Sequence, residues 1–158
     1  MDVNDYLLDT NGIDWAEELQ PWSWCIREPL SVLLANRFGD VFLQRDDGSV
    51  LWLDVGWADL RRVADSFEEF TQLLDEPANA DEWLKITITD ECRSLNMALT
   101  TGQCYGYVVP LFLGGKLEPS NIEATDISVH FHVLGQLGEQ TNELPAGTAI
   151  GRVESPDG

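Results

Sequence analysis

A thiol and two imidazoles are the side chains of this sequence that could support covalent catalysis. Cys104 lies in a segment rich in glycine and aromatic residues, and His130 and His132 follow later in the chain. A cysteine beside a histidine can act as a nucleophile, because the imidazole accepts the thiol proton. A cysteine in such a segment is, however, more often a small packed residue. The acidic residues are so numerous that no single glycosidase-like carboxylate pair stands out. We therefore predict no catalytic residues.

Metal and phosphate sites require spacings that this chain does not have. His130 and His132 could bind a metal from one side of a strand, but on a helix they would point about 200° apart. No zinc motif accompanies them. The turns Asp9–Gly12 and Asp46–Gly48 lack the ligand pattern of a calcium loop, and Gly102–Gly106 lacks the context of a phosphate-binding loop. We expect no metal and no cofactor.

The charge of the chain indicates the class of partner instead. The 158 residues carry 28 acidic and 9 basic side chains, a formal net charge of −19. Phosphate binding needs cations, so this charge disfavours direct binding of nucleic acid or an anionic membrane. It favours a basic protein partner and would speed the encounter with one. Plain solubility is the alternative explanation of the same charge.

The cysteine count and the N-terminal residues indicate the compartment. Three cysteines, without a CxxC pair, fit reduced thiols better than a disulfide framework. Residues 1–5 lack the basic, apolar pattern of a signal peptide. No segment approaches the roughly 20 apolar residues of a membrane span. We therefore expect a cytoplasmic protein.

Tryptophans and acids near turns are the candidate partner contacts. All six tryptophans fall in the first 83 residues, and tryptophan is a frequent anchor of protein interfaces. Most of them are expected in the core, with one or two of Trp22, Trp24 and Trp57 partly exposed. We expect the candidates to gather at a hairpin tip and the following turn. They are Trp22, Trp24, Asp46, Asp47, Asp54, Trp57 and Asp59.

Periodicity predicts the elements that position these residues. Residues 41–45 and 49–55 flank an Asp-Gly turn and predict a β-hairpin, with a further strand near 60–63. Short helices are predicted at 15–19, before Pro21, and at 30–36. Ser66 and Glu69 form a capping box that predicts a helix.

The second half of the chain is predicted in the same way. After Pro77, a second capping pattern at Asn79 and an apolar stripe from Leu84 to Leu99 predict one long amphipathic helix that ends at Gly102. A strand is predicted at 105–110. Residues 127–141 have helical spacing, with Thr125 as a possible cap, although alternation over 127–133 leaves a strand open. A last strand is predicted at 148–153. This mixture predicts an α+β fold with a small, mostly antiparallel sheet packed against helices.

Several motifs occur together in a recognisable order. They are Asn-Arg-Phe-Gly-Asp (36–40), Asp-Gly-Ser-Val-Leu-Trp-Leu-Asp (47–54), Phe-Glu-Glu-Phe (67–70), Gly-Gln-Cys-Tyr-Gly-Tyr (102–107), Leu-Gly-Gly (113–115), Asn121, and the stretch from His130 to Leu-Pro-x-Gly (144–147). With these motifs, residues 30–150 resemble the Tdi-type immunity proteins of bacterial type VI secretion systems. Many relatives carry an additional N-terminal region with a glycine-rich motif, where this chain has a short acidic, tryptophan-rich stretch.

The resemblance implies a cytosolic antitoxin without catalytic residues. Such proteins bind and neutralise a cognate toxin, a DNase in the best-known branch. The resemblance carries over only a structural signature, namely Phe38, Gly39, Asp40, Gly48, Tyr105, Gly106, Leu113, Gly114 and Gly115. It also implies one domain, with residues 1–29 as an N-terminal extension, 30–153 as the immunity domain and 154–158 as a tail.

The sequence thus predicts an immunity protein that occludes the basic active-site surface of an effector, expected to be a nuclease. The alternative is a non-enzymatic adaptor or regulatory protein-binding domain on the same scaffold. An adjacent toxin gene and tight binding would distinguish the first function from the second.

Overall fold

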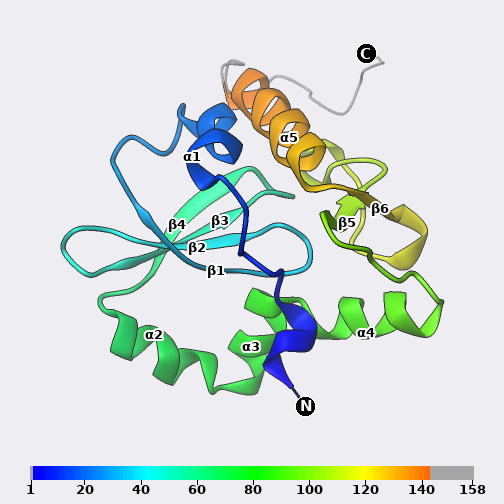
Figure 1. Cartoon of the computed structure of the whole chain (residues 1–158), viewed down its shortest axis with the longest axis horizontal. Helices are drawn as coiled ribbons and strands as arrows, with labels where there is room; N and C mark the ends of the chain where they lie inside the picture. The colour runs from blue at the N-terminus through cyan, green and yellow to red at the C-terminus, as the bar shows by residue number, and fades with distance from the viewer. Residues whose placement is uncertain (1, 143–158) are drawn as a thin grey trace.

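Two antiparallel sheets organise the fold (Figure 1). The computed structural model describes residues 2–142, and the α+β prediction is confirmed. The larger sheet has the order β1-β2-β3-β4, and the smaller one pairs β5 with β6. The strands are β1 (Ser31–Ala35), β2 (Val41–Gln44), β3 (Val50–Asp54), β4 (Asp59–Ala64), β5 (Gln103–Tyr107) and β6 (Ile122–Asp126). The helices are α1 (Trp15–Glu18), α2 (Phe67–Leu74), α3 (Pro77–Leu84), α4 (Ile86–Ser94) and α5 (Ile127–Asn142).

The predicted hairpin is the centre of the larger sheet. β2 and β3 pair in antiparallel register, with Phe42 opposite Trp52 and Gln44 opposite Val50. Almost every residue of both strands is buried, because both faces of this sheet are covered. Successive strand residues point to opposite faces, so the two strands contribute alternately to two cores. The predicted strand near 60–63 is confirmed as β4, which pairs with β3.

The two cores lie on opposite sides of the hairpin. On one side, Phe42 stacks on Trp52 within the sheet, and Phe70 stacks on Trp83 between the helices. Phe42 also contacts Phe70 at 5.2 Å and Trp83 at 5.9 Å, which attaches α2 and α3 to the sheet. On the other side, apolar residues of the sheet share a core with β5, α5 and the N-terminal residues. Trp22, at the end of a short 3-10 turn, is fully buried in this second core. Figure 1 shows α2, α3 and α4 along one edge of the molecule and α1 and α5 along the other.

Local sequence signals explain several helix boundaries. Ser66 caps α2 by accepting a hydrogen bond from the Glu69 N–H at 3.0 Å, as the capping box predicted. The predicted helix at 15–19 is confirmed as α1. Residues 127–142 form α5, so the helical alternative is confirmed and the strand alternative is wrong. Asp126, not Thr125, caps this helix by accepting from the Val129 N–H.

Two predictions of secondary structure are wrong. A helix was predicted at residues 30–36, but Ser31–Ala35 form the edge strand β1, whose apolar residues pair with β2. The predicted long helix is divided into α3 and α4 at Lys85, whose φ of 51° is left-handed. Asn79 therefore lies inside α3. The second helix ends at Ser94, well before Gly102.

The last predicted strand and the membrane-span prediction have different outcomes. The predicted strand at 148–153 lies outside the described residues. Among residues 2–142, no helix combines the length and the apolar character that crossing a membrane would require.

Candidate partner-binding site

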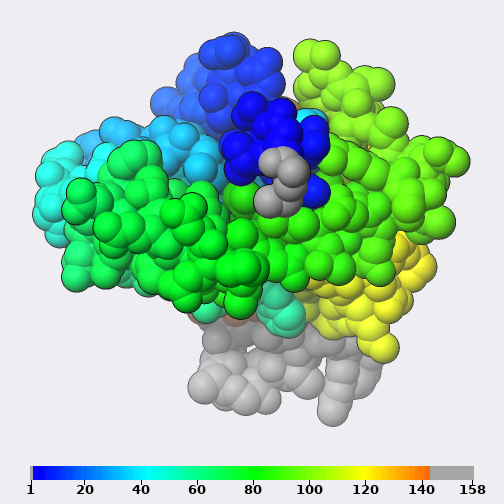
Figure 2. All heavy atoms as spheres, turned by 90° about the horizontal axis from the view of Figure 1, so that it is seen from below, coloured from blue at the N-terminus to red at the C-terminus, as the bar shows by residue number. Residues whose placement is uncertain are grey.

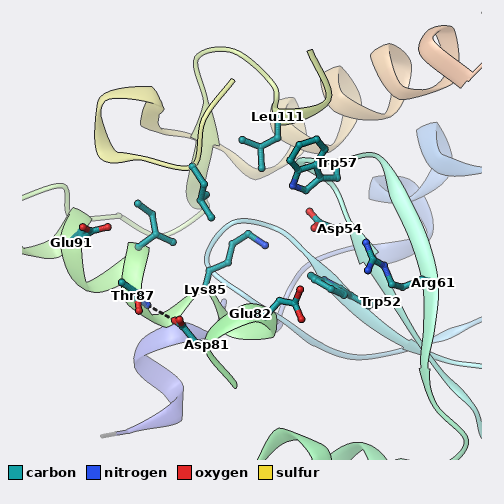
Figure 3. A pocket seen from close by; sticks show the side chains of 12 residues that line it. Trp52, Asp54, Trp57, Arg61, Asp81, Glu82, Lys85, Thr87, Glu91 and Leu111 are labelled. Carbon is teal, nitrogen blue, oxygen red and sulfur yellow. Dashed lines mark hydrogen bonds between the residues drawn. The ribbon is translucent and has the colours of Figure 1, made fainter. Parts of the chain in front are cut away.

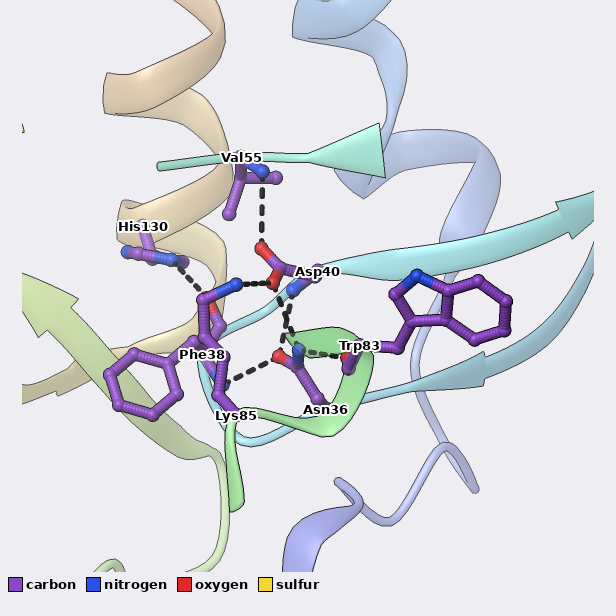
Figure 4. Close-up of polar contacts among 7 residues, drawn as sticks. All are labelled: Asn36, Phe38, Asp40, Val55, Trp83, Lys85 and His130. Atoms are coloured by element: carbon purple, nitrogen blue, oxygen red, sulfur yellow. Dashed lines mark hydrogen bonds and ion pairs between the residues drawn. The ribbon is translucent and has the colours of Figure 1, made fainter. Parts of the chain in front are cut away.

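A buried polar network joins the sheet to the break between α3 and α4. The Asp40 Oδ2 atom accepts hydrogen bonds from Lys85 Nζ at 2.5 Å and from Asn36 Nδ2 at 2.9 Å (Figure 4). Its Oδ1 atom accepts from the Val55 N–H at 3.2 Å. Asn36 also donates to the Trp83 carbonyl at 2.9 Å, which fixes the end of α3. A buried charge is tolerated when it is paired and hydrogen-bonded in this way.

The left-handed conformation of Lys85 follows from this network. Lys85 is only 6% exposed, and its ammonium group lies between the Asp40 carboxylate and the Trp52 ring, 5.5 Å from the ring centroid. Burial alone would lower the pKa of Lys85, but the charges of Asp40 and Asp54 outweigh it and raise the pKa above its ordinary value. Lys85 therefore stays charged, and its ion pair with Asp40 offsets the energetic cost of the left-handed backbone conformation.

Asp54 is a second buried acid beside this ion pair, and it lacks a cation of its own. It is 4% exposed, and within residues 2–142 its Oδ1 atom has no hydrogen-bond partner. Burial and the nearby Asp40 charge raise the pKa of Asp54 to about 7, and Lys85 opposes the shift only in part. Lys85 is bound to Asp40, and Arg61 is bound to Asp59 at 2.7 Å. Asp40 and Asp59 are therefore each paired with a cation, and Asp54 is not.

Asp54 lines an open pocket between the end of β3 and the helices α3 and α4. The pocket has a volume of about 380 Å³. Four carboxylates and two cations line it, with the indoles of Trp52 and Trp57. Figure 3 shows the Asp54 carboxylate, the Lys85 ammonium and the Trp57 indole directed towards the same space. Because Lys85 is already paired, the pocket carries an excess of negative charge and is complementary to a cation.

The outer face of α2–α4 extends this negative surface. Nine acids lie between residues 65 and 91, and all nine are exposed. Lys85 is the one base in this stretch, and it is buried. Figure 2 shows the three helices as one continuous face of the molecule. We call the exposed surface of residues 65–91 the helical acidic face.

The comparison with known families identifies the segment that carries this face. Residues 64–138 match the family model of the T6SS immunity protein Tdi1, C-terminal. The resemblance to Tdi-type immunity proteins is confirmed over this segment. A search of the curated proteins found no match. The Tdi1-like segment spans α2 to most of α5, so Asp81, Glu82 and Lys85 of the pocket lie inside it, whereas Asp54 and Trp57 precede it.

Four of the signature residues carried over from the resemblance, Phe38, Gly39, Tyr105 and Gly106, pack around His130 or against one another. The His130 Nε2–H donates to the Phe38 carbonyl at 2.8 Å. A Cβ atom on Gly39 or Gly106 would lie 2.8 or 3.2 Å from the His130 ring, so both glycines permit a close approach. The Tyr105 ring packs against Phe38 at an interplanar angle of 39°, with ring centroids 5.2 Å apart.

The residues predicted to contact a partner lie in three places: two at the hairpin tip, three at the other end of β3, and two packed against α5. Asp46 and Asp47 are exposed at the tip of the β2–β3 hairpin. Asp54, Trp57 and Asp59 lie at the opposite end of β3, where the chain turns into β4. The two groups therefore do not form one cluster at a shared tip.

The two remaining tryptophans pack against α5. Trp22 donates through Nε1 to the Phe131 carbonyl at 3.1 Å, and Trp24 donates to the Gly135 carbonyl at 3.2 Å. Trp22 is fully buried, Trp24 is partly buried and Trp57 is 54% exposed. The expectation that one or two of these three indoles are partly exposed is confirmed.

The residues with catalytic potential are separated from this pocket. Cys104 is buried, and burial raises the pKa of its thiol far above the ordinary value, whereas a nucleophile needs a lowered pKa. His130 is buried, and burial lowers its pKa, so the ring is neutral. His132 cannot form a shared site with His130, because two residues that are i and i+2 on helix α5 point in different directions. Within residues 2–142, no group of three or more His, Cys, Asp or Glu could hold a metal ion.

Sequence reasoning identified Asp54 and Trp57 but not their pocket partners. Asp81, Glu82 and Lys85 come from helices that the apolar stripe joined into one. The left-handed Lys85 depends on Asp40, which lies 45 residues away in the sequence. A lysine within an apolar helical stripe was the available signal, because a charged residue at such a position needs a partner.

Proposed function

We propose that this chain is a cytoplasmic immunity protein that binds and neutralises a cognate type VI secretion effector. The observation that carries the proposal is the match of residues 64–138 to the Tdi1 C-terminal family. An immunity protein acts by binding, so the chain needs a complementary surface and no reacting group. This agrees with the burial and raised pKa of the Cys104 thiol.

We further propose that the effector is a nuclease and that this chain covers its basic active-site surface. A nuclease presents cations where it holds phosphate. The helical acidic face offers nine exposed acids and no exposed base between residues 65 and 91. Such a surface can occupy the position of the phosphate backbone and exclude the substrate. The formal net charge of −19 would also speed the encounter by long-range attraction.

The contact region is proposed to centre on the pocket end of β3. Trp57 supplies an exposed indole there, in the pocket that Asp54 also lines, and Asp59 lies opposite Asp54 in the β3–β4 register. Exposed aromatic residues near the middle of an interface often carry much of the binding energy. Asp46 and Asp47 belong to the same predicted set but lie at the other end of the strand. They can contribute long-range attraction without entering the central contact.

The proposal predicts a toxin gene next to the gene for this chain, and co-expression with its product tests the proposed function. The chain should restore growth, co-purify with the toxin and bind it with a Kd in the nanomolar range, which corresponds to about 12 kcal/mol. Binding should weaken with added salt if charge complementarity contributes. If the toxin kills cells and the chain neither protects them nor binds it, the proposal is wrong. If it protects against a toxin that leaves nucleic acid intact, only the nuclease assignment fails.

A further inference from the structure

We propose that the pocket at the end of β3 receives an arginine side chain of the partner, which pairs with Asp54 and stacks on Trp57. This inference rests on the proposed function, because it names the chemical group that the effector would insert. The pocket differs from the remaining acidic surface in one respect: it contains a buried carboxylate that the fold leaves without a cation.

The unpaired state of Asp54 is the first step of the argument. Its Oδ1 atom is buried and has no hydrogen-bond partner among residues 2–142. Leaving a buried acceptor unsatisfied costs free energy, and the cost is larger for a charged group than for a neutral one. Neither neighbouring cation donates to it: the Lys85 ammonium pairs with Asp40, and the Arg61 guanidinium pairs with Asp59. An additional donor would remove this cost.

The shape and lining of the pocket are the second step. A volume of about 380 Å³ lies within the range of small-ligand pockets, roughly 300–1,000 Å³, so one long side chain can enter. Glu82 adds a second carboxylate at the wall formed by α3. The Trp57 indole is 54% exposed beside the entrance. The pocket therefore combines carboxylates with an accessible aromatic face.

Arginine fits this combination better than lysine does. A planar guanidinium can donate two parallel hydrogen bonds to a carboxylate and can also stack on an aromatic ring. Trp52 shows this contact within the chain, because the Arg61 guanidinium lies over its ring at 5.2 Å from the centroid. Trp57 offers a second indole without such a neighbour in the described part of the chain. A lysine ammonium would supply charge without the fork and the stacking surface.

A titration with small arginine compounds tests the pocket without the effector. The probe is N-acetyl-L-arginine methylamide, and the readout is the indole N–H resonance of Trp57 by NMR. N-acetyl-L-citrulline methylamide, which has a similar shape and no charge, is the matched control ligand. We expect a saturable shift in the low millimolar range with the arginine compound and at least a tenfold weaker response with citrulline. Equal shifts with both compounds, or no saturable shift up to about 50 mM arginine compound, would overturn the proposal.

Variants connect the pocket to the effector. Asp54→Asn should weaken binding of the arginine compound at least tenfold. Trp57→Ala alters an exposed residue and should do the same; because it lacks the Trp57 resonance, its readout is the indole N–H of Trp52, which lines the same pocket. Asp46→Asn, at the hairpin tip, is the matched control and should change binding by less than twofold.

The same three variants are then measured with the effector. At least a tenfold loss for Asp54→Asn and Trp57→Ala is expected. Tight binding by both variants would refute the pocket while leaving the immunity function intact. Failure of the wild-type chain to bind any adjacent toxin would instead refute the proposed function.

Discussion

The two ends of strand β3 present acids in opposite environments. At the hairpin tip, Asp46 and Asp47 are exposed, and Asp47 accepts a hydrogen bond from the Ser49 hydroxyl at 2.6 Å. At the other end, Asp54 is 4% exposed and interacts electrostatically with the nearby Asp40–Lys85 ion pair. The same residue type is therefore ordinary turn chemistry at one end and a source of unsatisfied charge at the other. Burial therefore distinguishes Asp54 as a candidate for one specific contact, whereas exposed acids can contribute through their charge.

Breaking the ion pair at the pocket end should produce the largest effect. Lys85→Met leaves Asp40 and Asp54 buried without a cation, and removing one partner of a buried pair costs about 3–5 kcal/mol of unfolding free energy. Arg45→Met is the control at the hairpin end, where the Arg45–Glu28 pair is 3.1 Å long and partly exposed. It should cost at most about 1 kcal/mol. Urea denaturation at pH 7 measures both, and equal losses would contradict the comparison.

The pH dependence of stability should show the buried acid directly. Burial raises the pKa of Asp54 to about 7 in the folded state, whereas an unfolded aspartate has a pKa of about 3.9. As the pH rises through this window, the unfolded state releases its proton first, so ionisation favours unfolding. Relative to Asp54→Asn, the wild-type protein should lose stability between about pH 4 and pH 7, by at most about 4 kcal/mol.

The control for this pH dependence is Asp46→Asn, which removes an exposed carboxylate. Below about pH 4 both states of Asp54 hold the proton, and above about pH 7 the penalty is complete, so the difference should be constant outside the window. Chemical denaturation at steps of one pH unit measures it. A difference between wild type and Asp54→Asn that rises with pH in favour of the wild type would contradict the assignment.

Two glycines allow a steric comparison of the same two ends. An alanine Cβ at Gly56, beside Asp54, would lie 2.8–2.9 Å from the Tyr107 ring and hydroxyl, so Gly56→Ala should cost about 1–3 kcal/mol through overpacking. Gly48, at the hairpin tip, has a φ of +92° and open space around it. Gly48→Ala should cost only the conformational penalty, about 1–2 kcal/mol. Thermal unfolding distinguishes them, and a larger loss at Gly48 would reverse the expected order.

The smallest effect is expected for the exposed indole. Trp57→Ala should change the unfolding free energy by no more than about 0.5 kcal/mol, because the side chain is more than half exposed and surface changes are usually within this range. The same variant is expected to weaken partner binding strongly. A large loss of stability would mean that Trp57 is retained for packing.

Local signals were sufficient to predict the hairpin end of the sheet and insufficient for the pocket end. An Asp-Gly turn between apolar runs identifies β2 and β3, and Ser66 with Glu69 identifies the start of α2, because both are short-range hydrogen-bonding patterns. The strand β1 was predicted as a helix, since a short apolar run does not distinguish the two. The break at Lys85 arises from a contact with Asp40, and periodicity cannot show a contact that distant.

Only part of the candidate site could be predicted from the sequence. Trp57 and Asp54 could be named from composition and position, but their separation from Asp46 and Asp47 depends on which end of β3 each turn occupies. Asp81, Glu82 and Lys85 enter the pocket only because two helices meet at an angle that the sequence does not encode locally. The burial of Trp22 similarly depends on α5, more than 100 residues further along the chain.

The most direct test of the account is the affinity of the effector for Asp54→Asn relative to Asp46→Asn, measured by calorimetry in the same buffer. The two variants make the same aspartate-to-asparagine change at opposite ends of β3, so they separate a specific contact in the pocket from a general effect of acidic side chains. The account predicts at least a tenfold weaker Kd for Asp54→Asn and less than a twofold change for Asp46→Asn. Equal losses for both variants, or a larger loss for Asp46→Asn, would contradict it.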